Sequence, residues 1–450
     1  MTKSMTEGKP LPLILQFAVP LLIGNLLQQT YNIIDAAIVG RILGPDALAG
    51  VGASSSVQFL VLGFCIGVCC GFGIPVARSF GAQDYEKMRS DIFHGMVLTG
   101  LFAVVLTVLC ALLCPQILRL LSTPEDIYTN AYQYLLIIFL GIPFNLLYNL
   151  LSGIFRSVGD SRTPFMFLAF STVLNIGLDL FFIIVLHLGC AGAALATVIS
   201  QAVSGILCYL YMRKKMPILR LNRQECRLDG HTVKMMLAMG LPMGLQYSIT
   251  AIGSMVMQSA NNGLGSVYVS GFTAGMRIKQ FAMCPFDALA TGVSVFCSQN
   301  LGAGRIQRIK TGIRQGTLVG ILYGVFAGLV LVFFGRTLSL LFVSGENAAI
   351  LDASAKYLRC LGCFYWSLGI LNVCRMSTQG LGFSGRVVFA GMMEMAARIG
   401  VSLILVPMFG FTAICFADQS AWLAACIYIV PTCLHCVRIC EKRAKKEAET

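Results

Sequence analysis

Long apolar stretches recur along the whole chain, and no other feature constrains its fold as strongly. Twelve runs of about 20 or more residues, nearly free of charge, alternate with short polar segments. Each run is long enough to cross a bilayer as a helix. Only 12% of the residues are charged, against about 25% in soluble domains. The sequence therefore predicts an all-α polytopic membrane protein.

Glycine, proline and charged residues mark the ends of these runs. The predicted helices cover residues 12–39, 48–77, 92–114, 126–153, 163–187, 190–212, 234–261, 265–299, 312–335, 349–376, 387–408 and 411–437. They divide into an N-lobe over residues 1–212 and a C-lobe over residues 234–437, with six helices each. A linker over residues 213–233 joins the lobes, and a basic tail covers residues 438–450.

Basic residues are distributed unevenly between alternate loops. One set of loops, which includes both termini and the linker, holds 24 of the 33 Lys and Arg residues. The opposite set holds only Arg41, Arg119 and Arg336. The positive-inside rule therefore predicts that both termini and the linker are cytoplasmic. Because the net charge of +13 resides in these short loops, it indicates membrane orientation, and we expect no nucleic-acid partner.

The two halves of the chain resemble each other. Residues 51–95 align with residues 272–316 at a constant offset of 221, and Pro20 has Pro242 as its counterpart. The alignment pairs Ala53, Gly71, Gly81, Ala82 and Gly95 with Ala274, Gly292, Gly302, Ala303 and Gly316. Both halves begin on the same side of the membrane, so the repeats are parallel. We expect a pseudo-two-fold axis along the membrane normal, with substrate bound between the lobes.

Several segments resemble one transporter family. LQQTYNIIDAAIVGRILGPDALAGVG (27–52), FRSVGDSRTPF (155–165), LNIGLDLFFI (174–183) and GAALATVISQ (192–201) are similar to N-lobe signatures of multidrug and toxic compound extrusion (MATE) transporters. Residues 271–305 resemble the eighth helix of that family and the loop after it. The chain is most similar to the bacterial branch with N-lobe acids, because Thr250 stands where the other branch has a glutamate.

The resemblance implies a function. It implies a secondary active antiporter that exports amphipathic organic compounds, cations among them, in exchange for H⁺ or Na⁺ by alternating access. It also implies a multi-pass protein of a bacterial inner membrane, in contact with the lipid bilayer, which we expect to be a monomer.

Asp35 is the only charged residue between Leu11 and Gly40. A helix rises 1.5 Å per residue, so Asp35 lies roughly six residues inside the outer end of its helix. Asp179 lies at a similar depth in the fifth helix, Asn175 one turn before it and Thr197 on the sixth helix. Intramembrane acids are usually functional, and this set of oxygen atoms can hold either H⁺ or Na⁺.

The resemblance assigns coupling-ion binding to the positions of these four residues. It places Tyr134, Asn149 and Gln28 around them. Pro20 lacks a backbone N–H, so we expect the first helix to bend there when the acids are neutralised. For Asn175 and Thr197, a simple contact between helices is the alternative interpretation.

The C-lobe carries a different set of charges. Arg277 and Lys279 lie deep in the eighth helix, and Asp287 could neutralise them or contact a cationic substrate. Glu394 and Arg398 are spaced for an ion pair within one helix. The residues predicted to line the substrate cavity are Tyr247, Met257, Met276, Arg277, Gln280 and Asp287.

The sequence also bears on two other classes of function. A lipid-linked oligosaccharide flippase of the same architecture is the alternative, because Arg277, Lys279 and Arg375 could bind a pyrophosphate. An enzyme would need a nucleophile–base pair or a metal cluster, and the sequence indicates neither. The 18 cysteines lie mostly inside apolar runs, so we expect no cofactor and no metal apart from Na⁺ at the coupling site.

Overall fold

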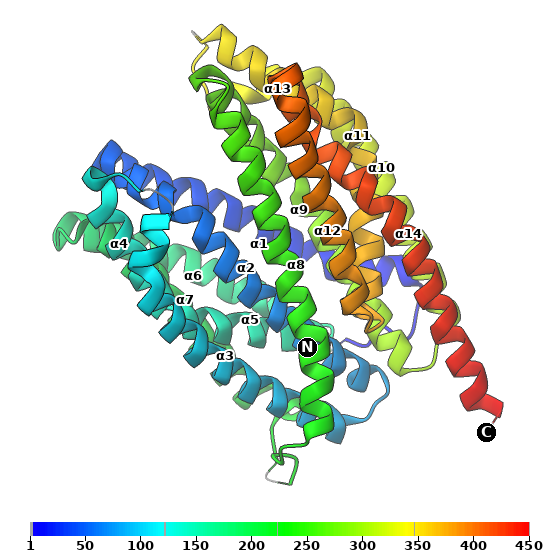
Figure 1. Ribbon diagram of the computed structural model, residues 1–450. Coiled ribbons are helices and arrows are strands. Elements are labelled where there is room, and N and C mark those ends of the chain that lie inside the picture. The colour runs from blue at the N-terminus through cyan, green and yellow to red at the C-terminus, as the bar shows by residue number, and fades with distance from the viewer. Residues whose placement is uncertain (1–2, 121–122, 223, 346, 450) are drawn as a thin grey trace. The chain divides into compact units, whose positions relative to one another are not determined.

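The predicted membrane helices are present in a computed structural model, which describes residues 3–120, 123–222, 224–345 and 347–449 (Figure 1). The first six correspond to α1 (Pro10–Ile38), α2 (Pro45–Gly81), α3 (Tyr85–Leu120), the pair α4 (Glu125–Leu140) and α5 (Ile142–Ser157), α6 (Arg162–Leu180) and α7 (Gly189–Lys215). The second six correspond to α8 (Gly230–Asn262), α9 (Ser266–Gly302), α10 (Ile306–Ser339), α11 (Ala348–Gly380), α12 (Ser384–Gly400) with α13 (Val406–Phe409), and α14 (Phe411–Glu449). Short helical turns η1 (Val39–Leu43), η2 (Phe181–Val185), η3 (Pro217–Leu219) and η4 (Val401–Leu405) complete the described elements.

Two of the predicted helices differ from straight apolar spans. The helix expected over residues 126–153 is bent by 48° between α4 and α5, where Pro143 cannot donate a backbone hydrogen bond. Among the residues that the structure describes, ten further helical segments are long and apolar enough to span a membrane, and α11 is not one of them. Because α11 packs against α9, α10 and α14, protein groups surround its buried polar residues, among them Ser354, Asn372 and Gln379.

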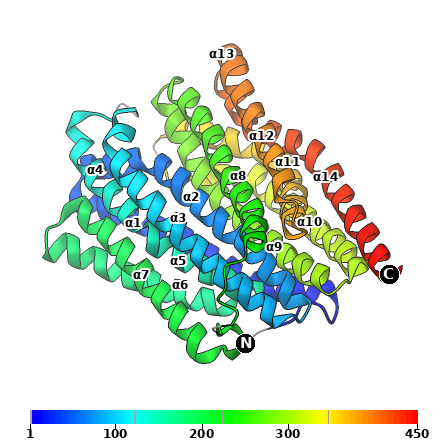
Figure 2. The same ribbon diagram turned by 60° about the horizontal axis from the view of Figure 1, so that its bottom comes forward.

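The chain folds as two compact units. Unit 1 contains Met1–Ser4 and Ile23–Gly244, and unit 2 contains Met5–Leu22 and Leu245–Thr450. In unit 1, α2 packs against α3, α4 and α5, while α7 packs against α4, α5 and α6. In unit 2, α11 is central, and Figure 2 shows α10, α11 and α14 running alongside one another.

Glycines allow α10 and α11 to pack with their backbones in contact. A Cβ atom at Gly328 would lie 2.3 Å from the carbonyl oxygen of Gly362, and one at Gly369 would lie 2.5 Å from the backbone of Gly320. Gly316, Gly320, Gly324 and Gly328 recur every four residues along α10. This small-residue spacing is typical of membrane helices, in which close packing replaces the hydrophobic effect as a source of association.

The internal repeat is confirmed in the backbone. Helices α2 and α9 are both 37 residues long. Glycines with positive φ occur in pairs at matching positions: Gly44 and Gly265 (91° and 105°), Gly159 and Gly382 (81° and 88°), and Gly189 and Gly410 (58° and 57°). A π-helical turn also follows α6 and α12. The same turns and helix ends therefore occur in both halves of the chain.

Candidate functional site

Two carboxylic acids meet inside unit 1. Asp35 on α1 and Asp179 near the end of α6 lie close enough for their carboxyl groups to interact directly. The Asp179 side chain is fully buried, and Asp35 is half-buried. Two carboxylates in a low-dielectric site repel each other, so together they favour binding of a proton or another cation.

Three further polar residues, Tyr31, Asn175 and Thr197, lie beside the acids. Asn175 Nδ2 donates to Thr197 Oγ1 (3.4 Å), and the Tyr31 hydroxyl lies 3.3 Å from the same oxygen. Thr197 Oγ1 also donates to the carbonyl oxygen of Ala193 (3.1 Å). The structure thus brings together Asp35, Asp179, Asn175 and Thr197, the four residues that the sequence places at one depth. We refer to these four residues as the acid cluster.

Several oxygen atoms of the acid cluster receive no hydrogen bond from the part of the chain that the structure describes. Within the described residues, Asp35 Oδ1, Asn175 Oδ1 and both carboxylate oxygens of Asp179 are buried without a partner. An ionised carboxylate left in this state costs several kcal/mol or neutralises instead. The same oxygen atoms are suitable ligands for a hard cation. The acid cluster therefore has the composition of a cation or proton site.

A π-helical turn follows each acid. Asp35 precedes η1 by one turn, and Asp179 stands two residues before η2. The two π-helical turns are in contact with each other. Such turns are rare in proteins and occur frequently at functional sites.

The predicted surrounding residues lie in different places. Tyr134 is buried and interacts with Gln58 and with both acids. Asn149 instead donates to the carbonyl oxygen (2.8 Å) and the side chain (3.0 Å) of Asn145. Gln28 is exposed. Pro20 lies inside α1, whose helical assignment continues through it.

Two residues near the acids were missed in the sequence analysis. Tyr31 precedes Asp35 by four residues, a spacing that places both on one helix face, and this was the available signal. The second residue is Gln58, which contacts Tyr134. Gln58 is the counterpart of Lys279 at the repeat offset of 221. Because Lys279 is a charged residue deep in the second repeat, its counterpart Gln58 could have been identified from the repeat alignment.

The predicted substrate residues are spread over unit 2. Met257 is buried in the apolar core of unit 2, so its side chain is not accessible from the protein surface. Met276, Arg277, Gln280 and Tyr247 are half-buried, while Asp287 is exposed on α9. Asp287 and Tyr247 both interact electrostatically with Arg375. The role of these residues in substrate binding stays a prediction.

The ion pair expected between Glu394 and Arg398 is confirmed, at 3.6 Å. It belongs to a larger network, because Glu394 also pairs with Arg375 and Arg398 pairs with Asp418 on α14 (3.1 Å). Of the two roles left open for Asp287, pairing with Lys279 is not the one found in this structure. Lys279 pairs with Asp418, which the packing of α14 brings to α9.

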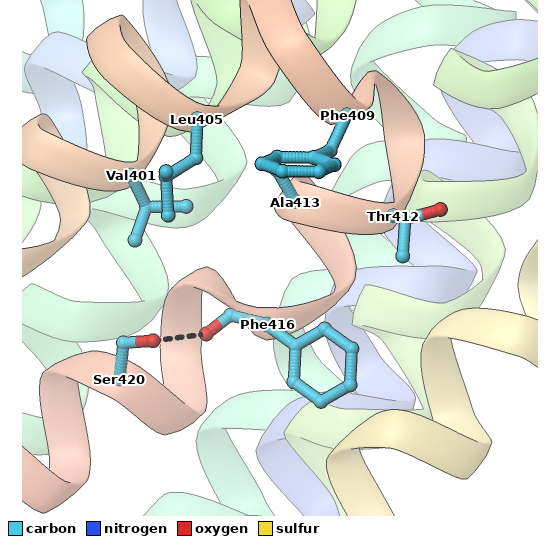
Figure 3. Close-up of a pocket in the computed structure, with 7 residues that line it drawn as sticks. All are labelled: Val401, Leu405, Phe409, Thr412, Ala413, Phe416 and Ser420. Carbon is cyan, nitrogen blue, oxygen red and sulfur yellow. Dashed lines mark hydrogen bonds between the residues drawn. The ribbon is translucent and has the colours of Figure 1, made fainter.

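A small apolar cavity of about 160 Å³ lies at the α12–α14 corner of unit 2 (Figure 3). Its walls are Val401, Leu405, Phe409, Thr412, Ala413, Phe416 and Ser420, and the Ser420 hydroxyl donates to the carbonyl oxygen of Phe416 (2.8 Å). It contains none of the predicted substrate residues. Among the described residues, no group of three or more His, Cys, Asp or Glu side chains could hold a metal ion.

Comparison with known proteins gives consistent matches. A family model described as MatE matches residues 20–181 and again residues 242–413. The chain is 32% identical over 422 residues to "Probable multidrug resistance protein YpnP" of Bacillus subtilis, covering 93% of this chain and 90% of that protein. It is 30% identical to "Probable multidrug resistance protein YoeA" of the same organism, covering 86% and 84%. A crystal structure titled "MATE in complex with MaL6" superposes with a TM-score of 0.90 at 21% identity and covers 100% of both chains.

Proposed function

Because the chain belongs to the MatE family of multidrug and toxic compound extrusion transporters, we propose that it exports amphipathic organic compounds in exchange for H⁺ or Na⁺ at the acid cluster. As a member of this family it is a membrane transporter and not an enzyme. The names of its relatives, which refer to drug resistance, support drug-like substrates. They do not favour the flippase alternative.

The observation that carries the proposal is the pairing of Asp35 with Asp179 amid oxygen atoms that receive no hydrogen bond from the described residues. When both acids are ionised, their repulsion and desolvation destabilise the site. A proton shared between them, or a Na⁺ held by the carboxylates and Asn175 Oδ1, removes this cost. The free energy of ion binding is therefore available to change the conformation of unit 1.

The conformational step proposed here involves α1. Asp35 and Tyr31 connect the outer part of this helix to α6 and α7. Neutralising Asp35 alters those contacts, and Pro20 provides a position at which the helix can bend with the loss of few backbone hydrogen bonds. We propose that this bending, in an alternating-access cycle, couples ion entry to substrate exit.

The orientation follows from the basic loops. With 24 of the 33 basic residues in one set of loops, both termini are proposed to lie in the cytoplasm of a bacterial cell. Substrate then leaves across the inner membrane, and the coupling ion moves inward down its gradient.

The experiment that tests the proposal is export of a fluorescent organic cation, ethidium, from proteoliposomes. A pH gradient is imposed first and a Na⁺ gradient second, so that the coupling ion is identified. Asp35→Asn is expected to lower ion-driven export at least ~10-fold, the effect of about 1.4 kcal/mol of lost coupling. Asp46→Asn, which changes an exposed acid on α2, is the matched control.

Export by Asp35→Asn at the wild-type rate, with equal reconstitution, would exclude the acid cluster as the coupling site. Scrambling of labelled lipid in the same vesicles, without ethidium export, would support the flippase alternative.

A further inference from the structure

Unit 2 contains a buried carboxylate with an unusually complete set of donors. Asp418 on α14 is 1% exposed. Lys279 Nζ contacts its Oδ2 atom at 2.5 Å, and the Tyr357 hydroxyl donates to the same oxygen at 2.9 Å. Arg398 Nε donates to Oδ1 at 3.1 Å, and Arg398 Nη2 lies 3.1 Å from the same oxygen in an ion pair. Three donor side chains, from α9, α11 and α12, therefore converge on one acid, and we call this group of residues the Asp418 site.

The Asp418 site occupies the position in unit 2 that Asn175, Thr197 and the neighbouring Gln58 and Tyr134 occupy beside the two acids of unit 1. At the repeat offset of 221, Lys279 corresponds to Gln58 and Asp418 to Thr197. At an offset of 223, which also pairs Gly159 with Gly382, Tyr357 corresponds to Tyr134 and Arg398 to Asn175.

The contacts repeat as well as the sequence positions. The Asn175–Thr197 hydrogen bond has its counterpart in the Arg398–Asp418 ion pair. The interaction of Tyr134 with Gln58 is matched by the convergence of Tyr357 and Lys279 on Asp418. Both repeats therefore contain a polar site at the same position, but the two sites carry different charges.

The acid cluster and the Asp418 site differ in what can neutralise their carboxylates. In the acid cluster, carboxylate oxygens are buried without donors among the described residues. At the Asp418 site, Lys279 places an ammonium group against the carboxylate, and the Trp422 ring lies 5.6 Å from Nζ. Lys279 itself is only 6% exposed. A cation attached to the backbone cannot leave, whereas a bound ion can.

We propose that Lys279 is a tethered counter-cation, which occupies permanently in unit 2 the kind of site that a coupling ion fills reversibly in unit 1. The chemical class of ligand that the vacated site would take is a monovalent cation, either Na⁺ or a small alkylammonium ion. One consequence of this proposal for transport, that ion exchange is confined to unit 1, rests on the proposed function. The role of Lys279 as a counter-cation does not depend on the proposed function.

Arg398 provides the competing explanation, because its guanidinium could neutralise Asp418 without Lys279. Arg398 also pairs with Glu394 (3.6 Å), which in turn pairs with Arg375. If Arg398 is sufficient, removing the ammonium group leaves a stable site that is indifferent to cations. If Lys279 is the counter-cation, its removal leaves Asp418 Oδ2 with Tyr357 alone and creates a cation-dependent site.

The first experiment measures thermal unfolding of the purified full chain in detergent while ethylammonium or Na⁺ is titrated. Lys279→Ala is expected to unfold at a lower temperature than wild type and to recover by about 3 °C or more as ethylammonium saturates. Lys279→Gln, which installs the residue type found at position 58, is the second variant should Lys279→Ala not fold. Lys279→Arg is the charge-retaining control.

Recovery must depend on Asp418. The double variant Lys279→Ala/Asp418→Asn is expected to show no cation-dependent rise, because no carboxylate remains to bind the ion. Wild-type stability of Lys279→Ala without added cation would overturn the proposal, and so would a loss of stability that neither cation reverses in either variant.

The second experiment separates this inference from the proposed function by measuring ²²Na⁺ binding. In an Asp35→Asn/Asp179→Asn background, binding is expected to be absent with Lys279 in place and to appear when Lys279→Gln is added. Binding that persists with Lys279 present would overturn the inference. If wild type binds no Na⁺ yet ethylammonium stabilises Lys279→Ala as expected, Na⁺ coupling fails while the inference stands.

Discussion

At the scale of single residues, the protein handles its buried acids in two opposite ways. Asp418 accepts from Lys279, Tyr357 and Arg398, whereas Asp179 accepts no hydrogen bond from the described residues. Because an unpaired buried charge is costly, the first arrangement favours a fixed structure. The second arrangement favours uptake of an ion. The difference arises from the residues that face each acid, not from the depth at which the acids lie.

The Thr197 hydroxyl links two polar side chains of unit 1, Asn175 and Tyr31, so its removal is a direct test of the acid cluster. In Thr197→Val, the amide of Asn175 and the hydroxyl of Tyr31 lose their shared partner. The change is expected to cost about 1–3 kcal/mol, because buried polar groups are left unsatisfied. Thermal unfolding in detergent measures this loss, and Thr197→Ser, which keeps the hydroxyl, should retain most of the stability. Equal unfolding temperatures for the two variants would contradict the assigned contacts.

At the scale of elements, close helix contacts and polar caps determine how the helices pack. The FRSVGDSRTPF segment is an example, since Gly159 makes the turn with positive φ and Asp160 accepts from the backbone N–H groups of Arg162 (3.1 Å) and Thr163 (3.0 Å). This arrangement satisfies donors at the start of α6. The role of this segment is therefore to position the helix that carries Asp179.

The α10–α11 contact depends on the absence of a side chain at Gly328. In Gly328→Ala, the new Cβ atom would lie 2.3 Å from the Gly362 carbonyl oxygen, so the backbones must separate. Overpacking of this kind costs about 1–3 kcal/mol, and unfolding in detergent is expected to occur at a lower temperature. Gly100→Ala on α3, where nothing lies within 4 Å, is the control and should be neutral or stabilising. A neutral Gly328→Ala would be inconsistent with the close contact.

The segment between α7 and α8 is held to α3 by two contacts. Arg89 Nη2 lies 2.6 Å from Glu225, and His94 Nε2 accepts from the backbone N–H of Asp229 (2.9 Å). The hydrogen bond from Arg89 lowers the pKa of Glu225. The contribution of this pair is therefore fully present above the usual Glu pKa and is lost as the pH falls through the lowered value.

Glu225→Gln should mimic that loss at neutral pH. Without the ion pair, the segment detaches more often, and trypsin is expected to cleave after Arg220 and Arg227 faster than in wild type. Limited proteolysis at pH 8 measures the rates. Glu125→Gln, an exposed acid at the start of α4, should leave the rates unchanged, and unchanged cleavage in Glu225→Gln would argue against the docking contact.

At the scale of the whole molecule, two copies of one six-helix plan carry different charges. The paired glycine turns and equal helix lengths show the common plan, and the family model matches the chain twice. Unit 1 keeps a pair of acids, while the equivalent place in unit 2 contains an ion network. Divergence of this kind confines ion exchange to one repeat in the proposed cycle.

The proposed orientation in the membrane is tested with reporter fusions. Alkaline phosphatase, which is active only outside the cytoplasm, should be active when fused after Leu188 and inactive when fused after Arg220. Green fluorescent protein fused after Thr450 should fluoresce, because the basic tail is predicted to be cytoplasmic. The reverse pattern of activities would contradict the orientation and the direction of transport.

The sequence by itself determined the membrane helices, the repeat and the depth of Asp35 and Asp179, because hydropathy and helical rise are local properties that accumulate along the chain. It could not show that α4 and α5 form a bent pair or that the polar helix α11 is central, since both depend on neighbouring helices. Tertiary structure alone decided which groups meet across the chain. Lys279 pairs with Asp418, 139 residues away, because helix packing chooses the partners of buried charges.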